Sequence, residues 1–358
     1  MPPATSLLSG TWPALVAAVA SAVDLEATAR QFKALQRRRK IQTAEALLRL
    51  ALMWGPGRQS FREAAALAGD AGIAELSDKA VEGRLRKMGD WLAHIVTTLL
   101  AERLGSPILA SGDTLELSLV DGSVICAPGK AQDWRLHARY DPGRGRFADL
   151  VLTTTREAEA ASRTRICPGR TLIMDRGYAR VRNFRAVLGA GGDFITRISW
   201  NSVKLNDANG QRIDIVAVLT DTTETRELPV WINGITHPSR LVIQPLPPEQ
   251  AERQRARRRR KANKNSRKID PRTVQAAGFL MLLTSLADAQ SPERVTELYR
   301  DRWQVEIGFK RLKTLGRLDE LPSADPVLAR TWLLAHLIAA VLTDDLANEI
   351  VGFSPSAR

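Results

Sequence analysis

The sequence contains few cysteines, few aromatic residues and no long hydrophobic run. Only two of its 358 residues are cysteine, Cys126 and Cys167, and they form no Cys-x-x-Cys pair. This excludes a disulfide framework and a cysteine-based zinc ribbon. The apolar stretches Pro13–Val23 and Trp332–Leu342 are about half as long as a membrane span. Because 44% of the residues are hydrophobic and 25% are charged, wholesale disorder is also excluded. We expect a reduced cytoplasmic protein that does not contact a membrane.

Acidic residues are also in deficit, and the excess of positive charge is local. The chain has 52 Lys and Arg against 39 Asp and Glu, a net charge of +13. The run Glu252–Lys268 alone carries +9, which leaves +4 for all other residues. Such a run favours a polyanionic partner, and DNA or RNA is the first candidate. We predict an exposed helix that contacts phosphates through Arg257, Arg258, Arg259, Arg260 and Lys261. A solvated helix surface with no partner is the alternative.

Residues 1–110 have the pattern of an all-α domain. Apolar residues at helical spacing predict a helix over Arg30–Trp54, and Ser60 with Glu63 forms a capping box for the next one. Ser77 is placed to cap a further helix with basic faces. Two short helices, the second of them basic, suggest a helix-turn-helix in which Lys79, Arg84 and Arg86 contact DNA. A small helical bundle with solvated charges explains the pattern equally well.

After residue 114 the pattern of apolar and polar residues becomes that of a mixed α/β fold. Leu115–Val120 reads as a strand that ends at Asp121, and Thr171–Met174 as one that ends at Asp175. Further strands are predicted over Asp133–Tyr140, Arg146–Thr153 and Asp193–Ser199, a helix over Asn183–Leu188, and a strand-like region over Trp200–Val242. A carboxylate at a strand end can share a cleft with another carboxylate and hold Mg²⁺. Either aspartate alone is more often a turn residue.

A helix predicted from Ser291 to about Lys313 supplies a third carboxylate. Tyr299, Arg302, Glu306 and Lys313 are spaced so that they lie within roughly 60° of one another on one helix face. Leu298, Val305 and Leu312 form the neighbouring apolar stripe. An ordinary i,i+4 ion pair between Arg302 and Glu306 is the simpler interpretation, but it does not explain the other two polar residues. A last apolar helix is predicted over Val327–Ile350.

This helix carries a motif that resembles the signature of a known family. Tyr299-Arg-Asp-Arg302-Trp-Gln-Val-Glu306, continued to Lys313, resembles the Y-R-E-K signature of the DDE transposases of bacterial insertion sequences. Leu119-Val-Asp121-Gly122 and Leu172-Ile-Met-Asp175-Arg176-Gly177 resemble the segments that carry the two aspartates of that family. The resemblance implies an α/β fold, namely a ribonuclease-H-like mixed sheet with a β-rich insertion, preceded by an all-α N-terminal DNA-binding domain.

By the same resemblance, the chain divides into four parts. Residues 1–110 would be the DNA-binding domain, 111–199 the first part of the catalytic core, 200–276 the insertion with the basic helix, and 277–358 the second part of the core. The activity would be cleavage at the ends of a mobile element and strand transfer into target DNA. Double-stranded DNA and a second copy of the chain would be the partners, in the bacterial cytoplasm at the nucleoid.

The resemblance also implies roles for individual residues. Asp121, Asp175 and Glu306 would bind two Mg²⁺ ions, for which Mn²⁺ can substitute. Phosphate contacts would come from Tyr299, Arg302, Lys313, Arg176 and Lys310. Related transposases that form DNA hairpins stack a flipped base on a Trp just before a Leu-Leu-Thr-Ser run. Here the run follows Phe279, which is the base-stacking candidate, with Trp200 and Trp231 as weaker substitutes.

Two other functions fit parts of the pattern. A DNA-binding protein derived from a transposase but without catalysis is one, because the chain stops at Arg358 soon after its last predicted helix. A nuclease acting on RNA–DNA hybrids is the other, because the same fold and metals serve that reaction. The three carboxylates disfavour the first, and the insertion and helical N-terminal region disfavour the second.

Overall fold

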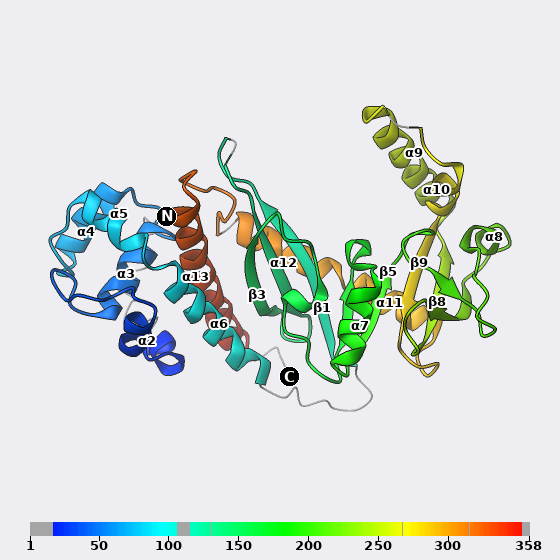
Figure 1. The fold of residues 1–358 in the computed structure, drawn as a ribbon, viewed down its shortest axis with the longest axis horizontal. Helices are drawn as coiled ribbons and strands as arrows, with labels where there is room; N and C mark the ends of the chain where they lie inside the picture. Colours follow the sequence, from blue (N-terminus) through cyan, green and yellow to red (C-terminus); the bar gives the residue numbers. More distant parts are fainter. Residues whose placement is uncertain (1–16, 106–114, 130, 267, 315, 353–358) are drawn as a thin grey trace.

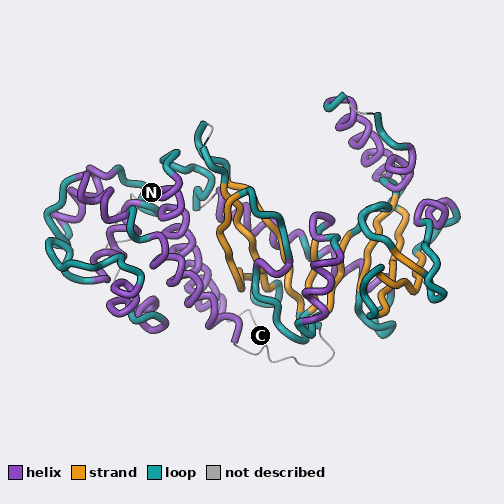
Figure 2. Tube along the Cα trace, in the orientation of Figure 1, coloured by secondary structure: helices purple, strands orange, loops and turns teal. Residues whose placement is uncertain are grey.

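A computed structural model describes residues 17–105, 115–129, 131–266, 268–314 and 316–352. One nine-stranded mixed sheet forms its middle (Figure 1). Helices near the N-terminus gather at one end of the molecule, and the segment that contains the basic helix projects at the other. Figure 2 shows that the strands lie between these two ends, with helices on both faces of the sheet.

The N-terminal part is helical, as predicted. Its helices are α2 (Leu25–Gln31), α3 (Ala44–Trp54), α4 (Phe61–Asp70), α5 (Asp78–Leu85) and α6 (Gly89–Gly105). The Ser60 capping box at α4 and the Ser77 cap at α5 are confirmed. The predicted boundary between residues 110 and 111 lies outside the described residues.

The single helix predicted over Arg30–Trp54 is wrong. The first helix ends at Gln31, and Lys33 adopts a positive φ of 58°, a conformation that interrupts a helix. A new helix begins only after Thr43, whose side chain accepts a hydrogen bond from the Ala46 amide. The basic cluster Arg37–Lys40 therefore lies in the connection between two helices.

The sheet combines parallel and antiparallel strands. Its strands are β1 (Leu117–Ile125), β2 (Trp134–Asp141), β3 (Arg146–Thr154), β4 (Thr171–Met174), β5 (Asp193–Arg197), β6 (Leu205–Asn206), β7 (Arg226–Ile232), β8 (Pro238–Pro245) and β9 (Phe279–Thr284). They lie in the order β3-β2-β1-β4-β5-β9-β8-β7-β6. β4 pairs in parallel with β1 and β5, and the other pairings are antiparallel.

The strand predicted to end at Asp121 continues to Ile125, which corrects that expectation. β1 pairs with β2 over its far half, from Asp121 opposite Ala138 to Ile125 opposite Trp134. β1 continues past Asp121 because β2, which comes later in the chain, pairs with it there. The local sequence Asp-Gly-Ser is typical of a turn and does not reveal this pairing. The strand before Asp175 ends as predicted.

The segment between β5 and β9 adds three strands to the same sheet and also contains helices. The strand-like interpretation of Trp200–Val242 missed α8 (Ile215–Thr220), which Asp214 caps. α9 (Pro248–Lys264) is the predicted basic helix, and only Ala251 in it is buried. α10 (Pro271–Ala276) follows and leads into β9. Because β9 pairs with β5 on one side and β8 on the other, the insertion continues the central sheet.

The helix predicted from Ser291 to about Lys313 is two helices, α11 (Pro292–Arg300) and α12 (Trp303–Thr314). Between them the amides of Arg302 and Val305 bond to carbonyls three residues back, at Tyr299 and Arg302. This tighter turn breaks the α-helical progression. The apolar stripe is confirmed, because Leu298, Val305 and Leu312 are all buried.

Two hydrophobic cores lie on the two faces of the sheet. On one face α12 packs on β1 and β2, and the N-terminal helices join the same core through α13 (Pro326–Gly352). On the other face, α7 (Val181–Gly189) covers β4 and β5. The segment Pro326–Asp345 of α13 is long and apolar enough to cross a membrane. It is longer than the apolar stretch Trp332–Leu342, on which the expectation of no membrane span was based. Since 67% of that window is buried against α6, α3 and β3, we interpret it as a core helix.

Candidate active site

Two carboxylates lie side by side where β1 and β4 part. The parallel pairing of these strands ends with Val120 opposite Met174, so Asp121 and Asp175 are the next pair in register. Residues that share a register position on adjacent strands point to the same face and are about 5 Å apart. The first of them lies within a strand and the second directly after one. The sheet topology therefore brings the two predicted aspartates together.

Asp121 is held in a desolvated position. Its side chain is 20% exposed, and its Oδ1 accepts a hydrogen bond from the Gly122 amide at 2.8 Å. Burial raises the pKa of Asp121 to about 6, against the opposing effects of that hydrogen bond and of Arg302, and the neighbouring charge of Asp175 adds to the rise. A carboxylate whose charged form is disfavoured in this way is a frequent feature of functional sites.

The turn between α11 and α12 brings three side chains onto this pair. The Tyr299 hydroxyl donates to Asp175 Oδ1 at 3.3 Å. The Arg302 guanidinium lies 3.4 Å from Asp121 Oδ2 and 2.5 Å from Glu306 Oε1. Burial would lower the pKa of Arg302, but Tyr299 and Glu306 outweigh it and the pKa is raised. Burial also raises the pKa of Tyr299 to about 12, with Asp175 adding to the rise. One guanidinium thus links two of the three predicted carboxylates.

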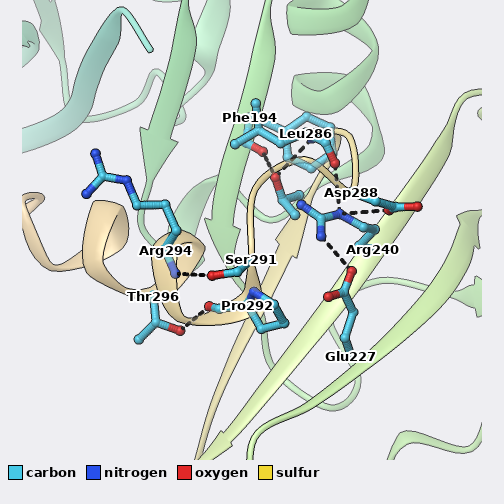
Figure 3. Close-up of polar contacts among 10 residues, drawn as sticks. Phe194, Glu227, Arg240, Leu286, Asp288, Ser291, Pro292, Arg294 and Thr296 are labelled. Atoms are coloured by element: carbon cyan, nitrogen blue, oxygen red, sulfur yellow. Dashed lines mark hydrogen bonds and ion pairs between the residues drawn. The ribbon is translucent and has the colours of Figure 1, made fainter. Parts of the chain in front are cut away.

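A buried arginine holds the connection between β9 and α11 (Figure 3). Arg240, on β8, is 6% exposed; it donates to the Leu286 carbonyl at 2.8 Å and to Glu227 at 2.6 Å. Ser291 then caps α11 by accepting a hydrogen bond from the Arg294 amide. These contacts fix the start of the helix whose last turn carries Tyr299.

An open groove of about 430 Å³ borders Asp121 and Glu306. It is lined by Asp121, Gly122, Ser123, Glu306, Phe309, Lys310, Lys313, Thr314 and Asp319. Lys313 donates to the Val124 carbonyl at 2.7 Å, and Lys310 is exposed. The two lysines predicted to contact phosphates therefore lie in the same groove as Asp121 and Glu306.

Two further hollows lie between the turn at Arg302 and the basic helix. One, of about 560 Å³, is lined by Tyr299, Arg302, Trp303 and Arg197 among others. The next, of about 170 Å³, shares Arg197 with it and is lined also by Arg176, Trp200, Arg258, Phe279 and Met281. Arg176, Arg258 and Phe279, which are far apart in sequence, thus share one small hollow. Burial and the neighbouring Arg176 and Arg197 lower the pKa of Arg258, as expected where guanidiniums converge.

The remaining predicted DNA contacts lie on two separate helices. On α9, Arg257, Arg259, Arg260 and Lys261 are exposed, and Arg259 also pairs with Glu252 at 3.2 Å. On α5, Lys79 is exposed, whereas Arg86, directly after the end of the helix, is paired with Glu82 at 2.9 Å and with Asp325 at 2.8 Å. Arg84 is half-buried on the same helix.

The donor set suits a hard divalent cation. Three carboxylates supply oxygen ligands of the kind that Mg²⁺ and Mn²⁺ prefer. In the described part of the chain no three acidic, His or Cys side chains are already arranged as a metal shell. The reason is visible at Arg302, which lies between Asp121 and Glu306 and supplies the positive charge there. The residues fit such an ion once this guanidinium moves aside.

Sequence reasoning missed two residues of this region. Arg197 lines both connecting hollows, and its place at the end of the strand after Asp175 was the available signal. Glu159 lies in a loop without a motif, yet its charge contributes to the raised pKa of Asp121. No local pattern could have pointed to it.

Comparison with known proteins gives consistent matches. The transposase DDE domain family matches residues 114–342. The transposase for insertion sequence element IS421 of Escherichia coli is 38% identical over 357 residues, with 96% of each chain covered. A protein of Escherichia coli (strain K12) named as the transposase InsL for insertion sequence element IS186A is 38% identical over 356 residues, again with 96% of each chain covered.

Proposed function

The chain belongs to the transposase DDE domain family, and from that premise we propose that Asp121, Asp175 and Glu306 are its catalytic carboxylates. The protein is a transposase of the IS186/IS421 type, and it cuts DNA at the ends of its element and joins them to a target. The observation that carries the assignment is the register of β1 and β4, which sets two aspartates side by side under Arg302 and Glu306. We also assign the helix pair α11–α12 to the Y-R-E-K group.

These carboxylates are suited to hold two Mg²⁺ ions, which would activate the attacking oxygen and stabilise the leaving one in an in-line displacement at phosphorus. The residues of the chain then have separate tasks. Arg302 exchanges its carboxylate partners for a phosphate, which its planar guanidinium can bind through two hydrogen bonds. Tyr299 holds Asp175 through its hydroxyl. Lys310 and Lys313 neutralise phosphates along the groove beside Glu306.

The strands β3-β2-β1-β4-β5 have the order and directions that we assign to a ribonuclease-H-like core. The insertion between β5 and β9 then supplies the second half of the DNA path. In this proposal residues 1–110 form the DNA-binding domain, 111–199 the first part of the catalytic core, 200–276 the insertion with the basic helix, and 277–358 the second part of the core.

DNA follows the row of cations from the carboxylates to α9 in this proposal. Arg302 borders the first hollow, Arg197 joins it to the second, and Arg258 connects the second to the basic helix. Contacts from α9 go to phosphates and are therefore independent of sequence and sensitive to salt.

Phe279 lines the second hollow together with Trp200 and Arg176, which supports its role as a surface for a stacked base. Lys79, Arg84 and Arg86 are the proposed contacts to the element ends, and the two ion pairs of Arg86 make it the weakest of the three.

Two ends of an element must be brought together, so we propose that the protein acts as a homodimer on DNA. As a transposase of a bacterial insertion sequence, it works in the cytoplasm, and we place it at the nucleoid.

The test is in vitro cleavage of a DNA fragment that contains an end of the element, with Mg²⁺ or Mn²⁺. Wild-type protein should nick at the element boundary, and Asp121→Ala, Asp175→Ala and Glu306→Ala should abolish nicking while DNA binding persists. Asp319→Ala, an exposed residue of the same groove, is the matched control and should retain activity. Full cleavage by the Asp121→Ala or Glu306→Ala variant would refute the assignment, and binding without cleavage by wild type would favour a protein that has lost catalysis.

A further inference from the structure

A fourth carboxylate lies against both aspartate segments, on the side of the sheet away from α12. Gly122 and Gly177 follow Asp121 and Asp175 closely in the chain. A methyl group at Gly177 would lie 2.6 Å from Glu159 Oε2, and one at Gly122 would lie 3.2 Å from Glu159 Oε1. One carboxylate therefore occupies the space that these two glycines leave open. Successive residues of a strand point to opposite faces, so Glu159 approaches the site from the face opposite Arg302.

The loop that carries Glu159 is fixed by hydrogen bonds to β2 and α7. Arg135 on β2 donates to the Glu157 carbonyl at 2.7 Å, and Arg182 on α7 donates to the Glu159 carbonyl at 3.3 Å. Asn183 accepts from the Ala161 amide at 3.1 Å and donates to the Tyr178 carbonyl at 2.8 Å. Through the Asn183 side chain, the last two bonds tie this loop to the segment after Asp175. The position of Glu159 is thus built into the fold.

Polar groups on this side of the site lack partners. Tyr178 is 1% exposed, and its hydroxyl has no hydrogen-bond partner within the described chain. Burial raises the pKa of Tyr178, and the neighbouring charges of Glu159, Asp121 and Asp175 add to the rise. The carboxylate of Glu159 itself receives no hydrogen bond from the described residues, and its cationic neighbour is Arg135 Nε at 4.0 Å. A buried hydroxyl without a partner costs free energy, and in native proteins it commonly bonds to water or a ligand.

An ordinary ion pair does not account for this arrangement. At 4.0 Å the contact between Arg135 and Glu159 is too long for a hydrogen bond, and Arg135 Nε is itself a buried donor without a partner. The Arg135 side chain instead uses Nη1 to hold the loop backbone. Two thirds of the Glu159 side chain is buried, with 31% exposed, so its charge is not simply solvated.

We propose that Glu159 is a positioning residue of the metal centre, which with the Tyr178 hydroxyl holds a water molecule of the hydration shell of a cation bound by Asp121 and Asp175. This inference rests on the proposed function, because it requires that the two aspartates bind the cation. Mg²⁺ keeps several of its waters when it binds to proteins. Groups that hold such outer ligands orient the site, and their loss typically lowers metal affinity roughly 10- to 100-fold. A fourth negative charge also offsets more of the charge of two divalent cations.

The test is a titration of the metal-free protein with Mn²⁺, without DNA, in which free Mn²⁺ is measured by electron paramagnetic resonance. Glu159→Gln keeps the shape of the side chain and should lower the Mn²⁺ affinity by roughly tenfold. Glu157→Gln is the matched control, because Glu157 lies two residues away and pairs with Arg163 at 2.5 Å; its affinity should equal that of wild type. The unfolding temperature of each variant in EDTA shows whether the fold is affected.

A second variant distinguishes a loss of metal affinity from a loss of folding. Tyr178→Phe removes only the unpartnered hydroxyl, so it should leave the unfolding temperature in EDTA unchanged or higher and still weaken Mn²⁺ binding several-fold. If both variants bind Mn²⁺ within twofold of wild type while Asp121→Asn binds it weakly, the role of Glu159 is refuted and the metal centre stands. If Asp121→Asn and Asp175→Asn also bind like wild type, the metal centre itself is refuted. A loss of affinity matched by an equal loss in the Glu157→Gln control would likewise overturn the role of Glu159.

Discussion

Replacing Asp121 by asparagine should stabilise the metal-free protein at neutral pH. Burial raises the pKa of this carboxyl from 3.8 to about 6, so the folded protein holds the proton more tightly than the unfolded chain does. The favourable contribution is complete below pH 3.8 and is lost as the pH rises through 6. This rise in the pKa corresponds to about 3 kcal/mol of unfolding free energy. Asparagine is never charged, and it can still accept the hydrogen bond from Gly122.

The pKa of about 6 already includes the opposing attraction of Arg302, so about 3 kcal/mol is the upper limit of the net gain. That guanidinium keeps Glu306 as a partner at 2.5 Å. We therefore expect Asp121→Asn to raise the free energy of unfolding by about 1–3 kcal/mol at pH 7.5 in EDTA. The gain should disappear at pH 4, where wild-type Asp121 is protonated.

Urea-induced unfolding followed by tryptophan fluorescence, repeated from pH 4 to 8, measures this difference. Asp319→Asn makes the same change of charge on an exposed side chain of the same groove and should change stability by less than about 0.5 kcal/mol. Excess Mg²⁺ should stabilise wild type but not Asp121→Asn. A variant less stable than wild type at pH 7.5, or a gain that persists at pH 4, would refute the reasoning about desolvation.

Three other predictions concern the sheet face, the core helix and the basic helix. Gly308→Ala adds a methyl group 2.8 Å from the Phe147 ring, so it should lower stability by about 1–3 kcal/mol in calorimetry; an unchanged unfolding temperature would contradict this packing. Burial lowers the pKa of His336 to about 4, so stability present above pH 6.5 should fall by up to about 3 kcal/mol as the pH drops to 4, and His336→Gln should flatten that dependence. Replacing Arg257 and Arg260 by alanine should weaken binding to element-end DNA in fluorescence anisotropy and reduce the salt slope by about 2; an unaltered slope would exclude α9 from the DNA contact.

Local chemistry made part of the fold predictable. The capping box of Ser60 and Glu63 begins α4, and Ser291 with the following proline begins α11, because these side chains satisfy amides within their own helix turn. The continuous apolar run Thr171–Met174 is β4 because a strand buried on both faces reads as apolar throughout. Asp121 and Asp175 could be predicted as site residues because each follows an apolar strand pattern.

Long-range pairing made the rest unpredictable. β1 passes through Asp121 because β2 pairs with it, and nothing near Gly122 in the sequence announces that partner. The turn at Arg302 divides one periodic apolar pattern into two helices without proline or glycine. Glu159 meets Gly122 from 37 residues further along the chain, through a loop held by side chains from β2 and α7. Such contacts exist only after the sheet has formed.

The most direct test of the account is to locate Mn²⁺ in crystals of the protein bound to element-end DNA, by its anomalous scattering. We predict two Mn²⁺ ions about 3.5–4 Å apart, ligated by oxygens of Asp121, Asp175 and Glu306, with Arg302 moved from its carboxylates to a DNA phosphate. Mn²⁺ bound elsewhere, or an Arg302 that still bridges Asp121 and Glu306 in a DNA complex that cleaves, would contradict it.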